Sequence, residues 1–267
     1  MSMNIAINGA AGRMGHMLLD LVNDADDLVL SGAYDYAEHP DLGKDALALM
    51  GKAPSGVALS TIPQQPQADA VIDFSLPVGF DALLDSLEKS PLPLVVGTTG
   101  LTDEQKQRLS TYAKTVPVVF APNFSTGVNL LFALVKQSLE VMGNTTEVEI
   151  VEAHHHHKKD APSGTAAKLL EVAADALGLD ATDDAVHGRF GDTGERPLKQ
   201  IGVHAMRGGE VVGEHTVFLF GNGERVELTH KAQSRSAFAV GALAAARWVM
   251  TQAPGLYDMQ QVLGLKG

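Results

Sequence analysis

With 267 residues, of which 45% are hydrophobic, the chain is long enough for two modest domains or one large one and can bury a substantial core. Its 20 Lys and Arg against 32 Asp and Glu give a net charge of −12, which makes it a poor nucleic-acid binder because phosphate attraction supplies most of that affinity. It contains no cysteine, which excludes disulfides, thiolate nucleophiles and thiolate-held metal clusters and fits a reducing compartment.

The sequence carries no signal for export or for a membrane. Its start lacks a basic region followed by an apolar stretch, so we expect no signal peptide. No apolar run is long enough to span a bilayer. We therefore expect a cytoplasmic protein without a membrane or nucleic-acid partner.

The first half alternates short apolar runs with helical patterns. Strands are predicted at 4–7, 28–33, 70–75, 92–96 and 116–120, and helices at 14–23, 77–89 and 102–114. Pro77 suits the first position of its helix, and Thr102 and Gln105 form a capping-box pair. Strands without polar alternation, separated by helices, predict a parallel sheet covered on both faces.

A glycine-rich turn follows the first predicted strand. Residues 5–15 read IAINGAAGRMG, which is G-x-x-G-x-x-G and not the strict G-x-G-x-x-G. The turn opens a helix, and the second strand ends at Asp35, about 20 residues on, where an acid meets the adenosine ribose in dinucleotide-binding folds. We favour this interpretation over an ordinary turn with a stray aspartate. For Arg13 the sequence allows two roles: its side chain contacts a phosphate, or it extends into solvent.

The residues around Asp35 bear on the choice of cofactor. An arginine is usually needed nearby to hold the 2′-phosphate of NADPH. Here the residue after Asp35 is the uncharged Tyr36, and the Asp35 carboxylate would repel that phosphate. We therefore predict a preference for NADH, with NADPH possible if Lys44 compensates.

Two further loops follow predicted parallel strands. Residues 97–99 read GTT, and residues 121–124 read APNF. Each lies where a strand's carboxyl end is expected, which is the edge that binds ligands in open α/β sheets. Together they are candidates for the floor of a nicotinamide site.

The second half has a different pattern. A strand is predicted at 146–153, a helix at 163–177, three strands at 200–206, 211–220 and 225–231, and a helix at 238–250 followed by a short terminal one. Adjacent strands without intervening helices indicate an open sheet with one buried face. The Gly-, Asp- and Arg-rich stretch 182–199 is expected to be a mobile loop.

A cluster of histidines and lysines precedes the predicted helix at 163. Residues 152–165 read EAHHHHKKDAPSGT, and its potential cations or donors are His154, His155, His157, Lys158 and Lys159. The helix start at 163–165 offers N–H groups to a carboxylate, so the segment suits a dicarboxylate. Histidine carries protons near neutral pH, and a lysine crowded by other cations can donate one.

Three alternative roles for this cluster compete with catalysis. His157 with His154 or His155 could ligate zinc, the segment could be a solvated basic loop, and Ser163 and Thr165 could merely cap a helix. We favour catalysis and predict no metal, because no third ligand stands at a recognised spacing.

The motifs GAAGRMG, GTTG, APNFSTGVN, EAHHHHKKDAPSGTA, VGEHTV and ERVELTHKAQSR occur in this order across nearly the whole chain. Together they resemble the 4-hydroxy-tetrahydrodipicolinate reductase family, also called dihydrodipicolinate reductase, of the diaminopimelate route to lysine. The resemblance implies reduction of hydroxy-tetrahydrodipicolinate to tetrahydrodipicolinate, with loss of water and hydride transfer from NADH or NADPH.

The resemblance also implies the fold and the assembly. The expected α/β fold has a Rossmann-type parallel-sheet domain at residues 1–125 and 235–267 and an α+β domain with a mixed open sheet at residues 126–234. The second domain would bind the substrate, a small dicarboxylate, and would join the chains, usually into a homotetramer.

Site residues follow from the resemblance in the same way. His154 would be the general acid/base and Lys158 the proton donor. The substrate would be bound by His155, Ser163, Gly164 and Thr165. The cofactor would be bound by Gly9, Ala10, Ala11, Gly12, Arg13, Met14, Asp35, Gly97, Thr98, Thr99, Ala121, Pro122, Asn123 and Phe124.

Two positions depart from the family pattern. Members usually have arginine at the position of His156, which we interpret as facing solvent. Members that use NADPH well often have arginine at the position of Tyr36. Another two-domain amino-acid-pathway dehydrogenase would share the first half but not the 152–165 segment, and a non-catalytic dinucleotide sensor or a metal hydrolase remains as an alternative.

Overall fold

The structure, a computed structural model, describes residues 2–265. The chain divides into two compact units, unit 1 comprising residues 1–126 and 236–267 and unit 2 comprising residues 127–235. Each unit has its own sheet and its own core.

Unit 1 contains a seven-stranded sheet whose strands all run parallel. The sheet order is β12-β6-β5-β4-β1-β2-β3. The strands are β1 (Met3–Asn8), β2 (Leu28–Tyr34), β3 (Leu59–Ser60), β4 (Ala70–Asp73), β5 (Leu94–Val96), β6 (Pro117–Phe120) and β12 (Gly255–Tyr257). The prediction of a parallel sheet is confirmed. The order reverses direction between β1 and β4, which is the place where doubly wound sheets bind ligands.

Helices cover both faces of this sheet, and each face has its own apolar cluster. The helices are α1 (Arg13–Asn23), α2 (Pro77–Leu87), α3 (Asp103–Tyr112), α6 (Ser236–Val249) and the short α7 (Met259–Val262). One cluster joins the sheet to α1 and α6, and the other joins it to α2 and α3. This two-sided burial explains why the central strands are apolar along their whole length.

The predicted helix starts are confirmed. Pro77 occupies the first turn of α2, and Thr102 and Gln105 form a reciprocal capping box at the start of α3. In that box the Gln105 N–H donates to Thr102 Oγ1 at 3.2 Å, and the Thr102 N–H donates to Gln105 Oε1 at 2.9 Å.

Unit 2 contains a mixed five-stranded sheet in the order β11-β10-β7-β9-β8. The strands are β7 (Glu147–His154), β8 (Ala185–His187), β9 (Ile201–Arg207), β10 (Glu214–Phe220) and β11 (Arg225–Lys231). β10 runs antiparallel to β7 and β11, whereas β7, β9 and β8 are parallel.

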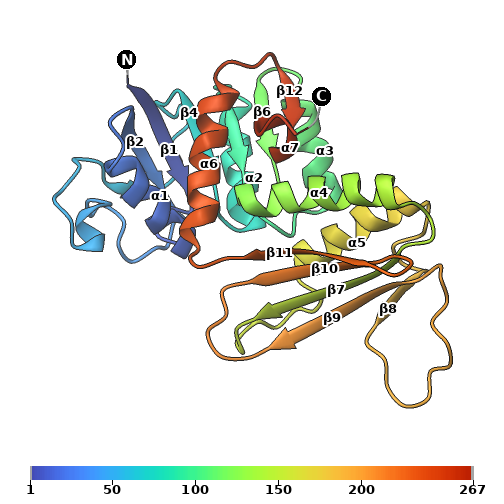
Figure 1. Ribbon diagram of the computed structural model, residues 1–267. Coiled ribbons are helices and arrows are strands. Elements are labelled where there is room, and N and C mark those ends of the chain that lie inside the picture. The colour runs from blue at the N-terminus through green and yellow to red at the C-terminus, as the bar shows by residue number, and fades with distance from the viewer. Residues whose placement is uncertain (1, 266–267) are drawn as a thin grey trace. The chain divides into compact units, whose positions relative to one another are not determined.

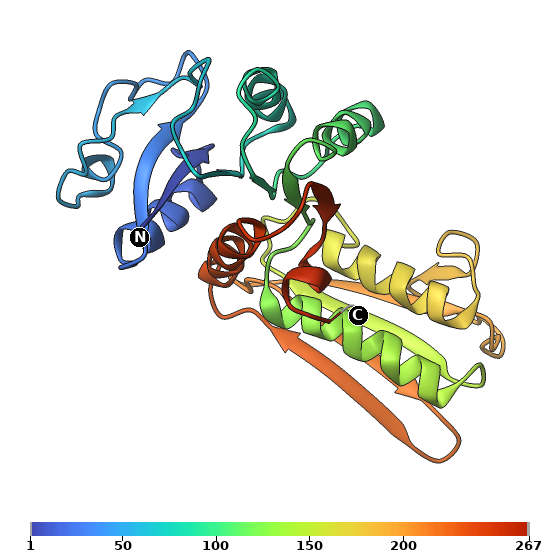
Figure 2. The ribbon, with the colours of Figure 1, turned by 90° about the horizontal axis from the view of Figure 1, so that it is seen from above.

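Two helices, α4 (Thr126–Met142) and α5 (Gly164–Leu177), lie on the same face of the unit 2 sheet (Figures 1 and 2). Buried Val, Ile and Leu side chains of β7, β9 and β10 pack beneath them. No helix of the described residues covers the opposite face, so the expected open sheet with one buried face is confirmed.

Three short strands were not predicted: β3, β8 and β12. β8 lies inside the stretch that we expected to be a loop, and it pairs with β9. Part of the same stretch is fixed by ion pairs, because Arg189 and Arg196 both contact Glu149 of β7, at 2.8 and 2.9 Å. The expectation of a loop is therefore wrong for residues 185–187.

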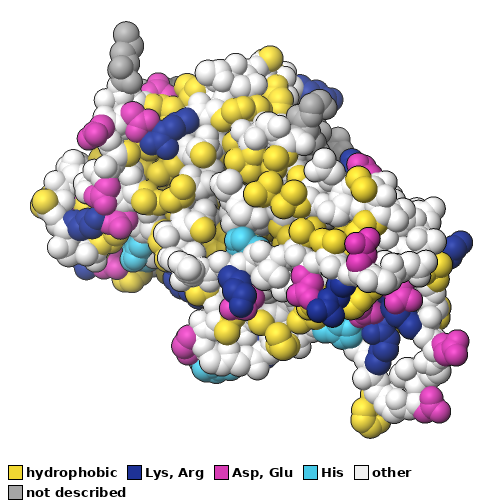
Figure 3. Space-filling model, in the orientation of Figure 1, with side chains coloured by type: hydrophobic (Ala, Val, Ile, Leu, Met, Phe, Trp, Pro, Cys, Tyr) yellow, Lys and Arg dark blue, Asp and Glu magenta, His cyan; other side chains and the backbone are white. Residues whose placement is uncertain are grey.

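The surface mixes both signs of charge. On the face shown in Figure 3, acidic and basic side chains are interspersed among apolar ones. Among the helices described, none combines the length and the apolar character that crossing a bilayer requires.

Candidate functional site

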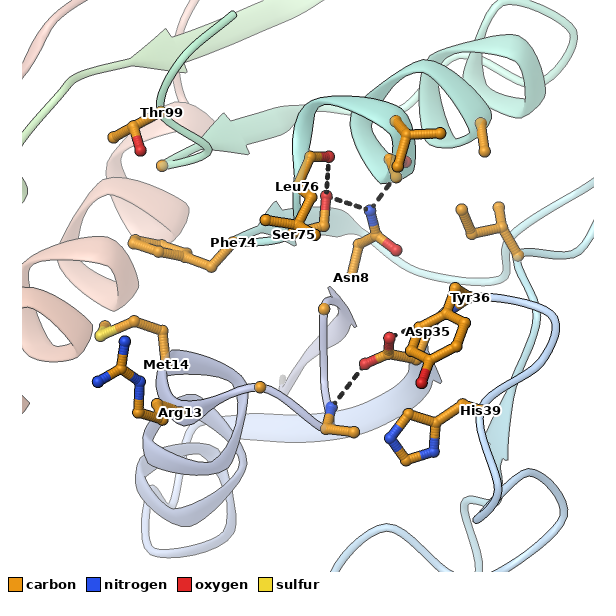
Figure 4. A pocket seen from close by; sticks show the side chains of 18 of the residues that line it. Asn8, Arg13, Met14, Asp35, Tyr36, His39, Phe74, Ser75, Leu76 and Thr99 are labelled. Carbon is orange, nitrogen blue, oxygen red and sulfur yellow. Dashed lines mark hydrogen bonds between the residues drawn. The ribbon is translucent and has the colours of Figure 1, made fainter.

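A cavity of unit 1, about 1220 Å³ in volume, lies at the carboxyl edge of its sheet (Figure 4). Its wall is built by the loops that directly follow β1 to β6, together with residues of α1 and α2 and Phe238 of α6. Convergence of six loops at one edge is the ligand-binding geometry of open α/β sheets.

Most of the predicted cofactor residues line this cavity. They are Gly9, Ala11, Gly12, Arg13, Met14, Asp35, Gly97, Thr99, Pro122, Asn123 and Phe124. The other three, Ala10, Thr98 and Ala121, are buried and do not line it. Their place is behind the wall, where they support the loops.

The glycine turn has the features that a pyrophosphate site needs. Gly9 has a φ of 77°, and a side chain there would meet the Phe74 carbonyl oxygen at 2.6 Å. Gly12 is the N-cap of α1 and makes no side-chain cap hydrogen bond, so the first turn of the helix and the positive end of its dipole are at the cavity wall. The Ala11 N–H donates to Asp35 Oδ2 at 2.9 Å and so fixes the turn against the end of β2. These residues fit a dinucleotide.

The loop after β4 was missed as part of the site. Phe74 and Ser75 line the cavity (Figure 4), and Asp73, which directly precedes them, is fully buried. Asp73 accepts hydrogen bonds from Asn8 Nδ2 at 2.8 Å, Ser75 Oγ at 2.6 Å and Thr98 Oγ1 at 2.7 Å. Burial raises the pKa of Asp73. The signal was present in the sequence, because this loop follows a strand just as the two recognised loops do.

The region that would meet the adenosine ribose includes an exposed aromatic side chain. Tyr36 is 57% exposed, lines the cavity and packs edge-on against His39 at 5.2 Å between ring centroids (Figure 4). Lys44, a candidate phosphate ligand from the sequence, is instead paired with Asp41 at 2.6 Å.

In unit 2, the predicted acid/base His154 ends β7 and is held by a buried carboxylate. His154 Nδ1 lies 2.6 Å from Glu152 Oε2, and Glu152 is 0% exposed. Lys158, the predicted proton donor, is paired with Asp160 at 2.8 Å. Neither Glu152 nor Asp160 was assigned a role from the sequence, although residues 152 and 154 share a face of any strand.

The predicted substrate ligands lie around the start of α5. Ser163 is its N-cap and is buried, its Oγ accepting from the Ala166 N–H at 3.2 Å, and Gly164 and Thr165 form the first turn. His155 Nε2 lies 3.5 Å from Arg235 Nη2. Burial, Arg235 and neighbouring histidines lower the pKa of His155. The N-terminus of a helix next to basic side chains is a suitable site for a carboxylate.

The loop after β9 brings Glu210 close to the histidine segment. Within residues 2–265, His156, His157 and Glu210 are brought together with ligand atoms within 4.8 Å of one another, and all three are exposed. This group differs from the pairs considered from the sequence, because its third member comes from the loop after β9.

His215 provides a test of the electrostatics of this region. Burial, followed by the charge of His154, lowers the pKa of His215 to about 4, so folding keeps its imidazole neutral. The unfolded chain binds a proton there between pH 6.5 and 4 that the folded chain rejects, and stability therefore falls as the pH falls through this window.

Urea denaturation at pH 7 and at pH 4.5 gives the loss of unfolding free energy between the two pH values. We expect this loss to be smaller in His215→Gln than in the wild type, by up to about 3 kcal/mol. His187→Gln, at an exposed position of β8, is the control and should keep the wild-type slope. An unchanged slope in His215→Gln would mean that His215 titrates normally in the folded chain.

Comparison with known proteins matches both units. The family model described as dihydrodipicolinate reductase, N-terminus, matches residues 3–124, and that described as dihydrodipicolinate reductase, C-terminus, matches residues 127–263. The 4-hydroxy-tetrahydrodipicolinate reductase of Anaeromyxobacter dehalogenans is 49% identical over 265 residues, covering 98% of both chains. That of Halorhodospira halophila is 48% identical, covering 99% of this chain and 100% of its own.

Among solved structures, the fold is similar to the dipicolinate-bound dihydrodipicolinate reductase from Paenisporosarcina sp. TG-14. The TM-score is 0.75 and the sequence identity 24%, and the match covers 98% of this chain and 99% of the other.

Proposed function

Because the chain belongs to the dihydrodipicolinate reductase family, we propose that it reduces 4-hydroxy-tetrahydrodipicolinate to tetrahydrodipicolinate with a nicotinamide cofactor. The observation that carries this function is near-complete alignment with relatives of that name at 46–49% identity. A step in the diaminopimelate route of lysine biosynthesis follows from the family.

The cofactor pocket of unit 1 supplies positions for each part of a dinucleotide. The backbone from Gly9 to Met14 and the start of α1 would hold the pyrophosphate, and Asp35 would accept from the ribose hydroxyls. The loops at 97–99 and 121–124 would contact the nicotinamide end, which supplies the hydride when bound.

The cluster of unit 2 supplies the acid/base chemistry. The proposed substrate is a dianion, and the protein itself has a net charge of −12, so binding requires a local group of hydrogen-bond donors. These donors would be His155 and the backbone N–H groups of Gly164 and Thr165, and the buried Ser163 would fix the helix start. His154 would exchange a proton with the substrate, and the Lys158 ammonium, held by Asp160, would donate one. These steps accompany loss of water and hydride transfer.

The decisive experiment supplies freshly made 4-hydroxy-tetrahydrodipicolinate and follows the oxidation of NADH and NADPH separately at 340 nm. We expect oxidation that depends on this substrate and survives dialysis against a chelator. Binding of NADH without turnover would favour a dinucleotide sensor. Loss of activity with chelator would favour a metal enzyme, and turnover only with another imine or aldehyde would favour a related dehydrogenase.

We further propose that NADH is preferred over NADPH. The acid Asp35 is followed by an uncharged Tyr36, and Lys44 is already paired with Asp41. Replacing Tyr36 with arginine should raise kcat/KM for NADPH by about tenfold, since one added charge-assisted hydrogen bond is worth about 1.5 kcal/mol.

The measurement compares kcat/KM for both cofactors in wild type and Tyr36→Arg. Tyr36→Phe, which adds no charge, is the matched control and should keep the wild-type ratio. A wild type that already prefers NADPH would contradict this proposal.

We also propose a cytoplasmic homotetramer joined through the uncovered face of the unit 2 sheet. Three large apolar side chains are on this face, Met206 of β9 and Phe218 and Phe220 of β10, and Met206 is 55% exposed. Covering such a face is a common reason for association. Sedimentation analysis of the wild type and of Phe218→Glu tests this, because the charge should dissociate the assembly.

A further inference from the structure

Glu152 is a buried carboxylate that joins the proposed acid/base to the start of α5. Its Oε2 faces His154 Nδ1 at 2.6 Å, and its Oε1 accepts from the Ser163 N–H at 3.0 Å. Arg207 of β9 donates one N–H to each of the two oxygens, both at 2.8 Å. Each carboxylate oxygen thus has two donors, which is what a fully buried carboxylate requires.

The ionisation of the Glu152 carboxylate determines which ring nitrogen of His154 carries the proton. Burial raises the pKa of Glu152, but hydrogen bonds from Arg207 and His154 outweigh burial and hold that pKa below its usual value. An ionised carboxylate only accepts hydrogen bonds, so the contact must be donated by His154 Nδ1–H. In neutral His154 the remaining lone pair is therefore on Nε2.

The surroundings leave space at that second nitrogen. A side chain at Gly213 would place its Cβ 3.1 Å from His154 Nε2, so glycine keeps this atom accessible. Arg207 also donates to the Asp160 carbonyl at 2.7 Å. The segment from His154 to Ser163 is consequently attached to one Glu152–Arg207 pair at its start, near its middle and at its end.

We propose that Glu152 is a positioning residue: it holds His154 as the Nδ1–H tautomer with Nε2 presented for proton exchange, and it anchors the carboxylate-binding start of α5 to the same group. This role rests on the proposed function for its effect on turnover, whereas the tautomer itself can be observed without substrate. A purely structural ion pair would lower stability when broken but would not control the proton of His154.

The test is Glu152→Gln, which keeps the shape of the side chain. Its Oε1 can still accept from Ser163 and from Arg207 Nη2, while its amide nitrogen, in the place of Oε2, donates to His154 Nδ1 and so requires the His154 proton to be on Nε2. Arg207 Nη1 loses Oε2 as an acceptor and retains the Met206 carbonyl. We expect kcat to fall about 100- to 1,000-fold, as for a catalytic histidine in the wrong tautomer, with the Kd for NADH unchanged.

Long-range ¹⁵N–¹H spectra of histidine-labelled protein report the tautomer, and His154→Gln assigns the resonance. We expect protonated Nδ1 in the wild type and protonated Nε2 in Glu152→Gln. The matched control is Glu149→Gln, on the opposite face of β7, because the Glu149 carboxylate also binds two arginines and a histidine. This variant should keep kcat within about twofold of the wild type.

Three outcomes would overturn the proposal: protonated Nε2 in the wild type, an unchanged tautomer in Glu152→Gln, or a kcat within threefold of wild type despite a changed tautomer. If Glu152→Gln does not fold, Arg207→Met replaces it. That variant leaves the carboxylate on His154 and should keep Nδ1–H, and loss of Nδ1–H would count against Glu152. If the wild type shows no turnover at all, the proposed function fails while the spectra still decide the tautomer.

Discussion

Replacing His154 with glutamine is expected to lower kcat for substrate-dependent NADH oxidation by about 100- to 10,000-fold, which is the usual contribution of a general acid/base. Glutamine keeps hydrogen-bonding ability but carries no proton at neutral pH. The side chain is only 12% exposed and is fixed by a contact of 2.6 Å to Glu152, so water cannot readily replace it. Steady-state and single-turnover rates with NADH measure the effect.

The Kd for NADH should not change in this variant, because the cavity that we propose for the cofactor is lined by residues of unit 1. His187→Gln, at an exposed position in the same unit as His154, should keep full activity. If His154→Gln retains more than about a tenth of the wild-type kcat, His154 is not the acid/base. A large rise in KM with unchanged kcat would instead make it a substrate ligand.

The architecture of unit 1 was predictable because its signals are local. Apolar runs of four to six residues, a proline at 77 and the Thr102–Gln105 pair all act within one element. The strands β3 and β12 were missed because they have only two and three residues, too few to show any periodicity. β12 also pairs with β6 from more than 130 residues away, which no local pattern records.

In the candidate sites, too, the parts that are contiguous in sequence were predictable and the partners brought in from other elements were not. The glycine turn, the two loops after strands and the 152–165 segment are each contiguous in sequence, so each could be recognised from the sequence as a candidate. The partners of these segments could not be. Arg207 reaches Glu152 because β9 pairs with β7 in parallel and places Arg207 opposite His154, a register that no residue pattern specifies. Thr98 was predicted to touch the cofactor, but its hydroxyl is turned inward to Asp73.

Gly241→Ala in α6 is expected to destabilise unit 1 by about 3 kcal/mol, although alanine is normally the better helix former by about 1 kcal/mol. A Cβ at this position would lie 1.8 Å from the Phe124 carbonyl oxygen. Because that atom is backbone, α6 and the loop must separate. Phe124 and Phe238 both line the cavity proposed for the cofactor, so the same shift should raise the Kd for NADH by at least about tenfold.

Thermal unfolding and calorimetric titration with NADH measure both effects, and a loss of about 3 kcal/mol corresponds to a fall in Tm of about 6–12 °C for a chain of this size. The neighbouring Val240→Ala is the control: this side chain is 52% exposed, so its truncation should change Tm by little. The sign of the change is decisive, because helix propensity alone predicts a higher Tm for Gly241→Ala. A Tm at or above that of the wild type would show that the loop at Phe124 yields freely, and the cavity wall would then not depend on close packing against α6.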